Sequence, residues 1–144
     1  MTKNDEILII YTSWYTDFIN EMTDAALERL ESEDCMIKSF KAPGSLEIPA
    51  LAKAKITSKT KGILAVGIVI RGETSHYDYV CGESARALMD LTTEFSLALG
   101  FGILTCENIK QARIRANINN KNKGGEAADA CLRMIEVKRH FRID

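Results

Sequence analysis

The sequence predicts an α/β fold of three layers, in which a four-stranded parallel sheet lies between helices on both faces. Short apolar runs of strand length alternate along the chain with longer segments whose apolar residues recur at helical spacing. Such alternation is typical of parallel strands joined by right-handed crossovers. The run from residue 63 to residue 70 is apolar throughout, as expected for a central strand covered on both faces. With 144 residues and no repeat or linker, the chain is expected to form one domain, 1–144.

The first part of the chain predicts a strand followed by a helix. Residues 7–11 form a short β-branched run bounded by polar residues, which indicates a buried strand. Either Thr16 or Asp17 is expected to cap the helix that follows. Its apolar face is marked by residues spaced three and four apart, namely Ile19, Met22, Ala26 and Leu30.

A second strand and helix follow. Residues 35–40 alternate well enough to predict a strand, and the sequence Lys-Ala-Pro-Gly-Ser then breaks it. Ser45 is the expected N-cap of a helix over about 46–56. Pro49 is compatible with that helix because it lies near the first turn, where proline is tolerated.

The second half of the chain predicts the two remaining strands and three helices. The strands cover residues 62–70 and 101–105, and a short helix covers residues 107–116. A polar stretch, 117–125, separates that helix from the last one. The core face of the long helix after residue 76 is assigned to Leu88, Leu91, Phe95 and Leu99, and that of the last helix to Ala128, Cys131, Leu132 and Ile135.

Composition and charge exclude several classes of function. Nineteen basic and twenty acidic residues give a net charge of −1, so no overall field favours nucleic acid or an anionic membrane as a partner. The longest apolar run is far shorter than the roughly 20 residues that span a bilayer. The acidic flank of the first apolar run does not fit a secretory signal, and a cytoplasmic location is expected. Free thiols, rather than disulfides or metal ligands, are expected at the widely spaced Cys35, Cys81, Cys106 and Cys131.

Unusual side chains gather where the predicted strands end. In open parallel sheets, ligands bind beyond the carboxyl ends of the strands. The segments that leave those ends are 13–15, 43–47, 71–76 and 106–108. In residues 70–79, a buried strand passes through Arg, Gly and two hydroxyl residues into a helix. The backbone N–H groups of such a helix start suit a phosphate or another anion, and His76 is expected beside it.

Four sequence blocks in these and later segments stand out. They are PGSLEIP at 43–49, GIVIRGETSHYDYV at 67–80, FGILT at 101–105, and 122–128, where NKG and EAA flank Gly125. Together they resemble lumazine synthase, the enzyme of the penultimate step of riboflavin biosynthesis. The resemblance covers nearly the whole chain, in order and with intact spacing. The block around residues 70–80 is the most specific of the four. The fold that the resemblance implies is a flavodoxin-like, four-stranded parallel sheet flanked by helices.

The resemblance also implies a reaction and an assembly. The reaction condenses 5-amino-6-(D-ribitylamino)uracil with 3,4-dihydroxy-2-butanone 4-phosphate. An amine attacks a ketone to give an imine, phosphate is eliminated, and the ring closes with loss of water. No metal or organic cofactor takes part. The active sites lie between neighbouring subunits of a homopentamer, some members assemble further into icosahedral shells, and riboflavin synthase is a candidate partner.

By the same resemblance, His76 is the catalytic residue. Histidine changes its charge near neutral pH, so it can carry protons between the amine, hydroxyl and leaving groups of the substrates. From its position alone, a histidine at a helix start is explained equally well as a capping or surface residue. Its removal is expected to slow the reaction rather than abolish it, because holding both substrates in place supplies part of the rate.

The butanone phosphate site is assigned by resemblance to Glu73, Thr74 and Arg115. Backbone N–H groups and the Thr74 hydroxyl are expected to bind phosphate, and the guanidinium of Arg115 would add paired, charge-assisted hydrogen bonds. Arg115 is expected to come from the next subunit. Without the resemblance, its best explanation is a solvated arginine on a helix that also carries Lys110 and Arg113.

The pyrimidine and ribityl site is likewise assigned by resemblance. Trp14 corresponds to the aromatic residue that stacks on the pyrimidine ring, although a lone tryptophan would be equally ordinary in a core. Phe101 corresponds to an apolar contact from the neighbouring subunit, while a strand phenylalanine is usually core. Glu47 alternatively favours the N-terminus of its own helix. The remaining positions of this site are Ser45, Leu46, Ile68, Val69 and Ile70, the last three acting largely through backbone groups.

The chain also departs from the family pattern. Many members have a glycine, a lysine and a second glycine where this chain has Asn117, Asn119 and Lys121, and an acidic residue is common at the position of Ile114. Lys123 keeps a positive charge near the site. These departures leave the assigned site positions intact and weaken the expectation of assembly beyond a pentamer, since this loop lies near subunit contacts.

Two other functions remain as alternatives. The first is a catalytically silent relative that binds a flavin precursor or serves as a shell scaffold, against which the presence of His76, Thr74 and Arg115 argues. The second, available without the resemblance, is a flavodoxin-like binding or signalling module. A metal-dependent phospho-receiver would need an acidic cluster after the first strand, and Trp14 stands there instead.

Overall fold

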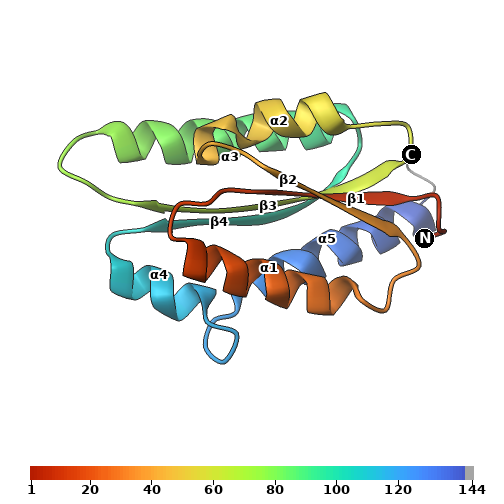
Figure 1. Ribbon diagram of the computed structural model, residues 1–144. Coiled ribbons are helices and arrows are strands. Elements are labelled where there is room, and N and C mark those ends of the chain that lie inside the picture. The colour runs from red at the N-terminus through yellow and green to blue at the C-terminus, as the bar shows by residue number, and fades with distance from the viewer. Residues whose placement is uncertain (142–144) are drawn as a thin grey trace.

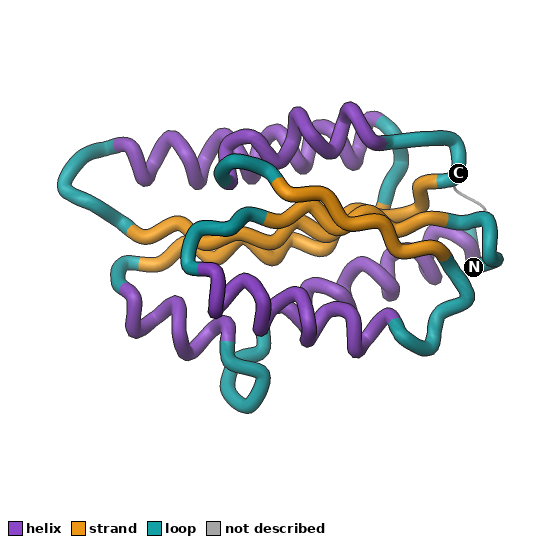
Figure 2. Tube along the Cα trace, viewed as in Figure 1, coloured by secondary structure: helices purple, strands orange, loops and turns teal. Residues whose placement is uncertain are grey.

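The computed structural model describes residues 1–141 and has the predicted α/β fold (Figure 1). Its four strands are all parallel and lie in the order β2-β1-β3-β4. Figure 2 shows helices in a layer on each side of the sheet, with α1, α4 and α5 on one face and α2 and α3 on the other. The strands are β1 (Glu6–Tyr11), β2 (Met36–Lys41), β3 (Thr60–Ile70) and β4 (Ala98–Cys106). The helices are α1 (Thr16–Leu30), α2 (Ile48–Lys55), α3 (His76–Glu94), α4 (Ile109–Ala116) and α5 (Lys123–His140), with a 3₁₀ turn, η1 (Ser45–Glu47), before α2.

The sheet separates two apolar cores because successive side chains of a strand point to opposite faces. In β3, Leu64 and Val66 join the core under α1, α4 and α5, while Ile63 and Ala65 join the core under α2 and α3. The continuous apolar run of β3 is therefore covered on both faces, as its sequence predicts. Alternate residues of β1 divide between the two cores in the same way.

The starts of two helices differ from prediction. The residue before α1 is Tyr15, in a left-handed conformation with φ 61°, and no side chain caps the helix there. The Thr16 hydroxyl instead donates to the Ser13 carbonyl at 2.7 Å. Ser45 does not cap α2 either, because it is buried within η1, and α2 begins at Ile48. The prediction that Pro49 lies in the first turn is confirmed.

The C-terminal boundary of α3 also differs from prediction. The helix ends at Glu94, and Ser96 has a left-handed φ of 51°, which stops the helix. Phe95 is the C-cap residue and still packs against the core under α2 and α3, as does Leu99. Leu99, however, lies in β4 rather than on the helix. Leu99 follows Phe95 by four residues, so it matches the helical spacing by coincidence although it belongs to the next buried strand. This coincidence explains why the helix was predicted to be too long.

The last helix begins earlier than predicted and meets α1 closely. Asn122 is its N-cap, with φ 45°, and its side-chain oxygen accepts a hydrogen bond from Gly125 N at 3.2 Å. Gly124 lies against the backbone of Met22 in α1: a Cβ placed on it would be 2.7 Å from the Met22 Cα and closer still to its carbonyl oxygen. The absence of a side chain at this glycine allows α1 and α5 to approach.

All four cysteines are free thiols, as predicted. Cys106 and Cys131 are buried, and Cys35 and Cys81 are partly buried. Burial raises the pKa of Cys131 to about 12, so this thiol stays protonated at neutral pH. Among residues 1–141, no helix is long and apolar enough to cross a membrane, and no cluster of side chains suited to a metal ion is found.

Glu6 is a buried carboxylate that joins β1 to β2 and to the loop before β3. It is 2% exposed and accepts hydrogen bonds from Lys38 Nζ at 2.7 Å and from the Thr57 hydroxyl at 3.1 Å. The hydrogen bond from Lys38 lowers the pKa of Glu6 below its usual value. A carboxyl group whose pKa is lowered by folding stabilises the fold above its unfolded pKa, and this stabilisation is lost as the pH falls through the folded pKa.

We therefore expect Glu6→Gln to lower the free energy of unfolding at neutral pH by about 1–3 kcal/mol, since a charge-assisted hydrogen bond is lost. The difference from the wild type should shrink as the pH is lowered below about 4. Urea unfolding at a series of pH values measures both effects. Asp129→Asn is the control, because the Asp129–Arg29 pair is exposed on both sides and should contribute little. A difference that is constant across the pH series would contradict the role assigned to the carboxylate.

Candidate active site

A cleft of about 490 Å³ opens at the carboxyl ends of the strands. Three segments that are distant in the sequence meet there: the loop after β1, the turn η1 with the residues before it, and the passage from β3 into α3. Parallel strands place their carboxyl ends at the same edge of the sheet, which is why these segments converge. The cleft is lined by Trp14, Tyr15, residues 43–47, residues 68–70, Gly72, Thr74, His76, Tyr77 and Val80.

Trp14 forms one exposed wall of this cleft. The indole is 65% exposed, and its Nε1 donates a hydrogen bond to the Pro43 carbonyl at 3.1 Å. The polar edge of the ring is thereby held by the neighbouring loop, while much of its surface is left to solvent. An apolar ring surface held in place in this way suits stacking against a planar ligand.

The turn η1 follows the segment that holds Trp14 and lies close against β3. Ser45 is only 6% exposed, and its side chain occupies the space that a Cβ on Gly67 of β3 would fill. The glycine in β3 therefore sets how deeply η1 lies. Leu46 is 46% exposed and lines the cleft together with Glu47.

β3 supplies backbone groups to the cleft because it is longer than its neighbour at this end. Pairing with β1 stops at Tyr11 and Val66, where Thr12 N donates to the Val66 carbonyl, while pairing with β4 continues to Ile70. Backbone groups of alternate residues in a strand point to the same side. Ile68 and Ile70 therefore direct their N–H and C=O groups to the side that β1 has left open. The side chain of Val69 packs against the core under α2 and α3.

The loop between β3 and α3 holds the residues expected to bind an anion. Thr74 and His76 line the cleft, and the Thr74 hydroxyl accepts a hydrogen bond from His76 N at 3.3 Å. His76 is the first residue of α3 and is exposed. Glu73 lies in the same loop but is not among the residues that line the cleft. Ser75, the residue before α3, makes no side-chain cap hydrogen bond, and its carbonyl accepts a hydrogen bond from Asp78 N at 3.0 Å.

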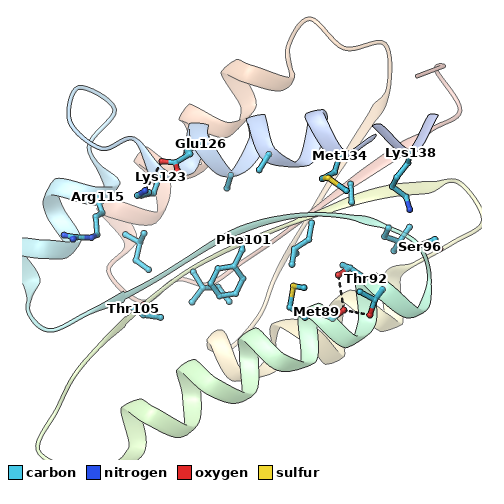
Figure 3. Close-up of a pocket in the computed structure, with 18 residues that line it drawn as sticks. Met89, Thr92, Ser96, Phe101, Thr105, Arg115, Lys123, Glu126, Met134 and Lys138 are labelled. Carbon is cyan, nitrogen blue, oxygen red and sulfur yellow. Dashed lines mark hydrogen bonds and ion pairs between the residues drawn. The ribbon is translucent and has the colours of Figure 1, made fainter. Parts of the chain in front are cut away.

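Phe101 and Arg115 lie in a second pocket of about 810 Å³, which shares no residue with the cleft. Figure 3 shows the Phe101 ring over β4, between α3 and α5, with Arg115, Lys123 and Glu126 grouped toward α4. Arg115 Nη1 donates to the Gln111 carbonyl at 3.2 Å, and Lys123 Nζ pairs with Glu126 at 2.9 Å. The pocket runs along β4, the edge strand of the sheet. On one chain, Phe101 and Arg115 are thus not brought together with His76.

The comparison with known proteins decides the family. The sequence profile described as 6,7-dimethyl-8-ribityllumazine synthase matches residues 4–139. The chain belongs to the 6,7-dimethyl-8-ribityllumazine synthase family. The resemblance inferred from the four sequence blocks is thereby confirmed.

Relatives of the same name are similar over most of their length. The 6,7-dimethyl-8-ribityllumazine synthase of Methylorubrum extorquens (strain PA1) is 43% identical over 144 residues, covering 96% of this chain and 83% of the relative. That of Bartonella tribocorum is 42% identical, covering 98% of this chain and 95% of the relative. The 6,7-dimethyl-8-ribityllumazine synthase 1 of Rhizobium meliloti is 45% identical, covering 96% of this chain and 95% of the relative.

Some residues at the site of this lumazine synthase family member were not assigned from the sequence. Tyr15, Tyr77 and Val80 line the cleft, and Glu126 lines the second pocket together with Lys123. Lys123 and Glu126 are three residues apart, a spacing that predicts an ion pair on a helix. The pair was missed because residues 117–125 were interpreted as a polar stretch that precedes the helix. Val80 recurs four residues after His76, on the same face of α3.

The loop between α4 and α5 is compact. The Asn117 side chain accepts a hydrogen bond from Asn119 N at 2.8 Å, and Lys121 N donates to the Ile114 carbonyl at 3.2 Å. Ile118 N donates to Glu21 of α1 at 3.1 Å. Hydrogen bonds of Asn117 thus support a turn, and the bond from Ile118 N ties that turn to α1.

Proposed function

We propose that this chain condenses 5-amino-6-(D-ribitylamino)uracil with 3,4-dihydroxy-2-butanone 4-phosphate, yielding 6,7-dimethyl-8-ribityllumazine, phosphate and water. Membership of the family, whose profile spans residues 4–139, is the observation that carries the proposal. The cleft supports it, because it combines an exposed aromatic ring, open backbone groups on β3 and a histidine beside an anion-binding loop. Together these features fit a planar, polar ring next to a phosphate.

In the proposed reaction, the 5-amino group attacks the ketone, and the resulting carbinolamine loses water to give an imine. Elimination then removes the proton from C3 and expels phosphate from C4, which leaves an enol that tautomerises to a C3 ketone with a C4 methyl group. The ribitylamino nitrogen attacks this new carbonyl, and ring closure expels a second water. Each step moves protons between nitrogen, carbon and oxygen, so a single base that is able to both accept and return a proton is sufficient. Among the cleft residues, His76 is the imidazole suited to this role.

The pyrimidine is proposed to lie between Trp14 and the end of β3. Its ring would stack on the indole, and its carbonyl and N–H groups would pair with the open backbone groups of Ile68 and Ile70. The ribityl hydroxyls would be bound by η1, through Ser45, Glu47 and the backbone around Leu46. Recognition by backbone groups fits a ring with alternating donors and acceptors, because a strand edge presents the same alternation.

The phosphate is proposed to bind at the start of α3, against backbone N–H groups of Glu73 and Thr74 and the Thr74 hydroxyl. A guanidinium would complete this site and stabilise the leaving phosphate. Arg115, with Lys123 nearby, is the proposed source, and it lies in the second pocket rather than in the cleft. Arg115 would complete the site if the second pocket of an adjacent copy lay against the cleft of this chain. Phe101 would then supply an apolar contact to the same site.

This sharing of sites supports a closed ring, in which every chain gives its cleft to one site and its β4 pocket to the next. By the family resemblance, the ring is proposed to be a homopentamer. A ring of identical heterologous contacts closes without leaving an incomplete site. The proposed setting is the cytoplasm, where the four free thiols would stay reduced. The lumazine product would pass to riboflavin synthase, the proposed partner in the following step.

The test is an assay of the purified protein with both substrates, following lumazine absorbance and free phosphate together. Both are expected to rise in parallel above the uncatalysed background. Phosphate release at the background rate would overturn the enzyme function and leave the silent relative as the explanation. Sedimentation of the native protein should give pentamers or multiples of them, whereas an active monomer would contradict the shared site.

The phosphate assignment predicts a selective kinetic defect. Arg115→Ala should raise the KM for the butanone phosphate about 10- to 100-fold, the value of one or two charge-assisted hydrogen bonds, with a much smaller effect on the KM for the pyrimidine. Steady-state kinetics with each substrate varied in turn measures both constants. Arg113→Ala is the matched control on the same helix, since Arg113 lies near Phe18 and not in the pocket. Equal increases for both substrates would show that Arg115 does not bind phosphate.

A further inference from the structure

Arg71 is the first residue after β3 and makes three contacts with side chains around it. Its Nε donates to Glu107 at 2.8 Å and its Nη1 to Asp78 at 3.3 Å. Its guanidinium carbon lies 4.3 Å from the centre of the Tyr77 ring, in cation–π geometry. The hydrogen bond that Arg71 donates to Glu107 is the main cause that raises the pKa of Arg71, and the charges of both carboxylates add to it, so the guanidinium stays charged. One guanidinium thus bridges the start of α3 and the end of β4.

These contacts span the loop that holds the proposed phosphate and proton sites. Residues 71–76 are all exposed, so little packing holds this loop in place. Its first residue is fixed by the backbone bond from Arg71 N to the Cys106 carbonyl at 2.9 Å. The side chain of the same residue then reaches across to Tyr77 and Asp78, which directly follow His76. Both ends of the loop are therefore joined through a single arginine.

We propose that Arg71 is a positioning residue, which holds His76 and the loop 72–75 in place by joining the start of α3 to Glu107. This inference rests on the proposed function, because it concerns the geometry of that reaction. Arg71 is not among the residues that line the cleft, and its charge is already shared by two carboxylates. It therefore acts through its neighbours and does not bind the substrate phosphate.

The contribution of Arg71 is to geometry more than to stability. Its two ion pairs have exposed partners, and such pairs contribute little to the free energy of unfolding. Catalysis is far more sensitive, because misplacing a reacting group by about 1 Å costs on the order of 100-fold in rate. A lysine cannot replace this arrangement, since an ammonium lacks the planar fork that reaches two carboxylates while stacking on a ring.

Kinetics of Arg71→Gln tests the inference. We expect kcat to fall about 10- to 100-fold, with a much smaller change in the KM for the pyrimidine. Arg86→Gln is the matched control, because Arg86 also pairs with two carboxylates but lies further along α3, away from the cleft. The kcat of Arg71→Lys should lie between those of Arg71→Gln and the wild type. A wild-type kcat in Arg71→Lys, or equal losses of kcat in Arg71→Gln and Arg86→Gln, would overturn the bridging role.

A double variant separates positioning from a general defect. If Arg71 acts through His76, adding Arg71→Gln to His76→Ala should lower kcat by much less than it does in the wild type. An undiminished loss would show that Arg71 acts independently and would overturn the inference. Failure of the proposed function gives a different result, since the wild-type protein would then have no turnover in the same assay.

A measurement without substrate completes the test. The chain has two histidines, so the imidazole signals of His76 and His140 can be assigned in an NMR spectrum by comparison with His76→Ala. Arg71→Gln should shift or broaden the signal of His76 and leave that of His140, which packs against Phe141, unchanged. An unchanged His76 signal would contradict the positioning role even if the activity had fallen.

Discussion

Combining His76→Ala and Arg115→Ala chains in one assembly is expected to restore activity above the level of either variant alone. His76 lines the cleft and Arg115 lies in the separate pocket along β4. If each site takes its cleft from one chain and its β4 pocket from the next, a site with both native halves forms wherever the two variants meet in the right order. Random mixing should make about a quarter of the sites native. Co-refolded mixtures assayed for lumazine formation measure this fraction.

The control for this experiment combines His76→Ala with Trp14→Ala. Both residues line the same cleft, so every cleft in the mixed assembly carries one lesion and no native site can form. No recovery is expected in this case. Recovery in the control, or its absence in the first mixture, would mean that the two pockets do not complete each other across a subunit boundary, and the shared-site proposal would fail.

Gly124→Ala is expected to cause a large loss of stability, although it adds only one methyl group. A Cβ at this position would overlap the backbone of Met22, and a backbone cannot rotate away as a side chain can. Overpacking of a rigid contact costs about 3 kcal/mol, and α5 would have to shift away from α1. Urea unfolding at a fixed protein concentration gives the change in the free energy of unfolding.

Gly82→Ala is the matched control for this prediction. Gly82 is also helical, in α3, but a Cβ there would meet nothing within 4 Å. Replacing an unobstructed helical glycine by alanine stabilises a protein by up to about 1 kcal/mol. The two substitutions should therefore change stability in opposite directions. Similar losses in both variants would show that helix propensity, and not the contact with α1, determines the result.

The sequence was sufficient to predict the layers and the strand direction, because these follow from patterns that are local. The continuous apolar run of β3 and the helical spacing in α1 and α5 can each be recognised from the residues of a single strand or helix. The position of the cleft followed from the same pattern, since parallel strands gather the segments that leave their carboxyl ends. Trp14, Ser45 and His76 accordingly lie around one cleft.

What the sequence did not reveal depends on contacts between distant segments. The start of α1 is set by a left-handed Tyr15, and the burial of Ser45 by the missing side chain of Gly67. Neither leaves a periodic signal. The three contacts of Arg71 likewise join β3, α3 and the end of β4, and no spacing rule connects residues 71 and 107. Tertiary packing, rather than local propensity, decides all three.

The unequal ends of β1 and β3 have a consequence for how the proposed site can vary. On the proposed function, the pyrimidine takes the place that a longer β1 would occupy, so the substrate extends the sheet as one more hydrogen-bonded partner. Recognition of the ring then depends on main-chain atoms, which side-chain substitution does not remove. Apolar exchanges at Ile68 and Ile70 should accordingly be tolerated among relatives without loss of the substrate. Specificity for the pyrimidine is in this sense encoded by strand length rather than by the residues displayed.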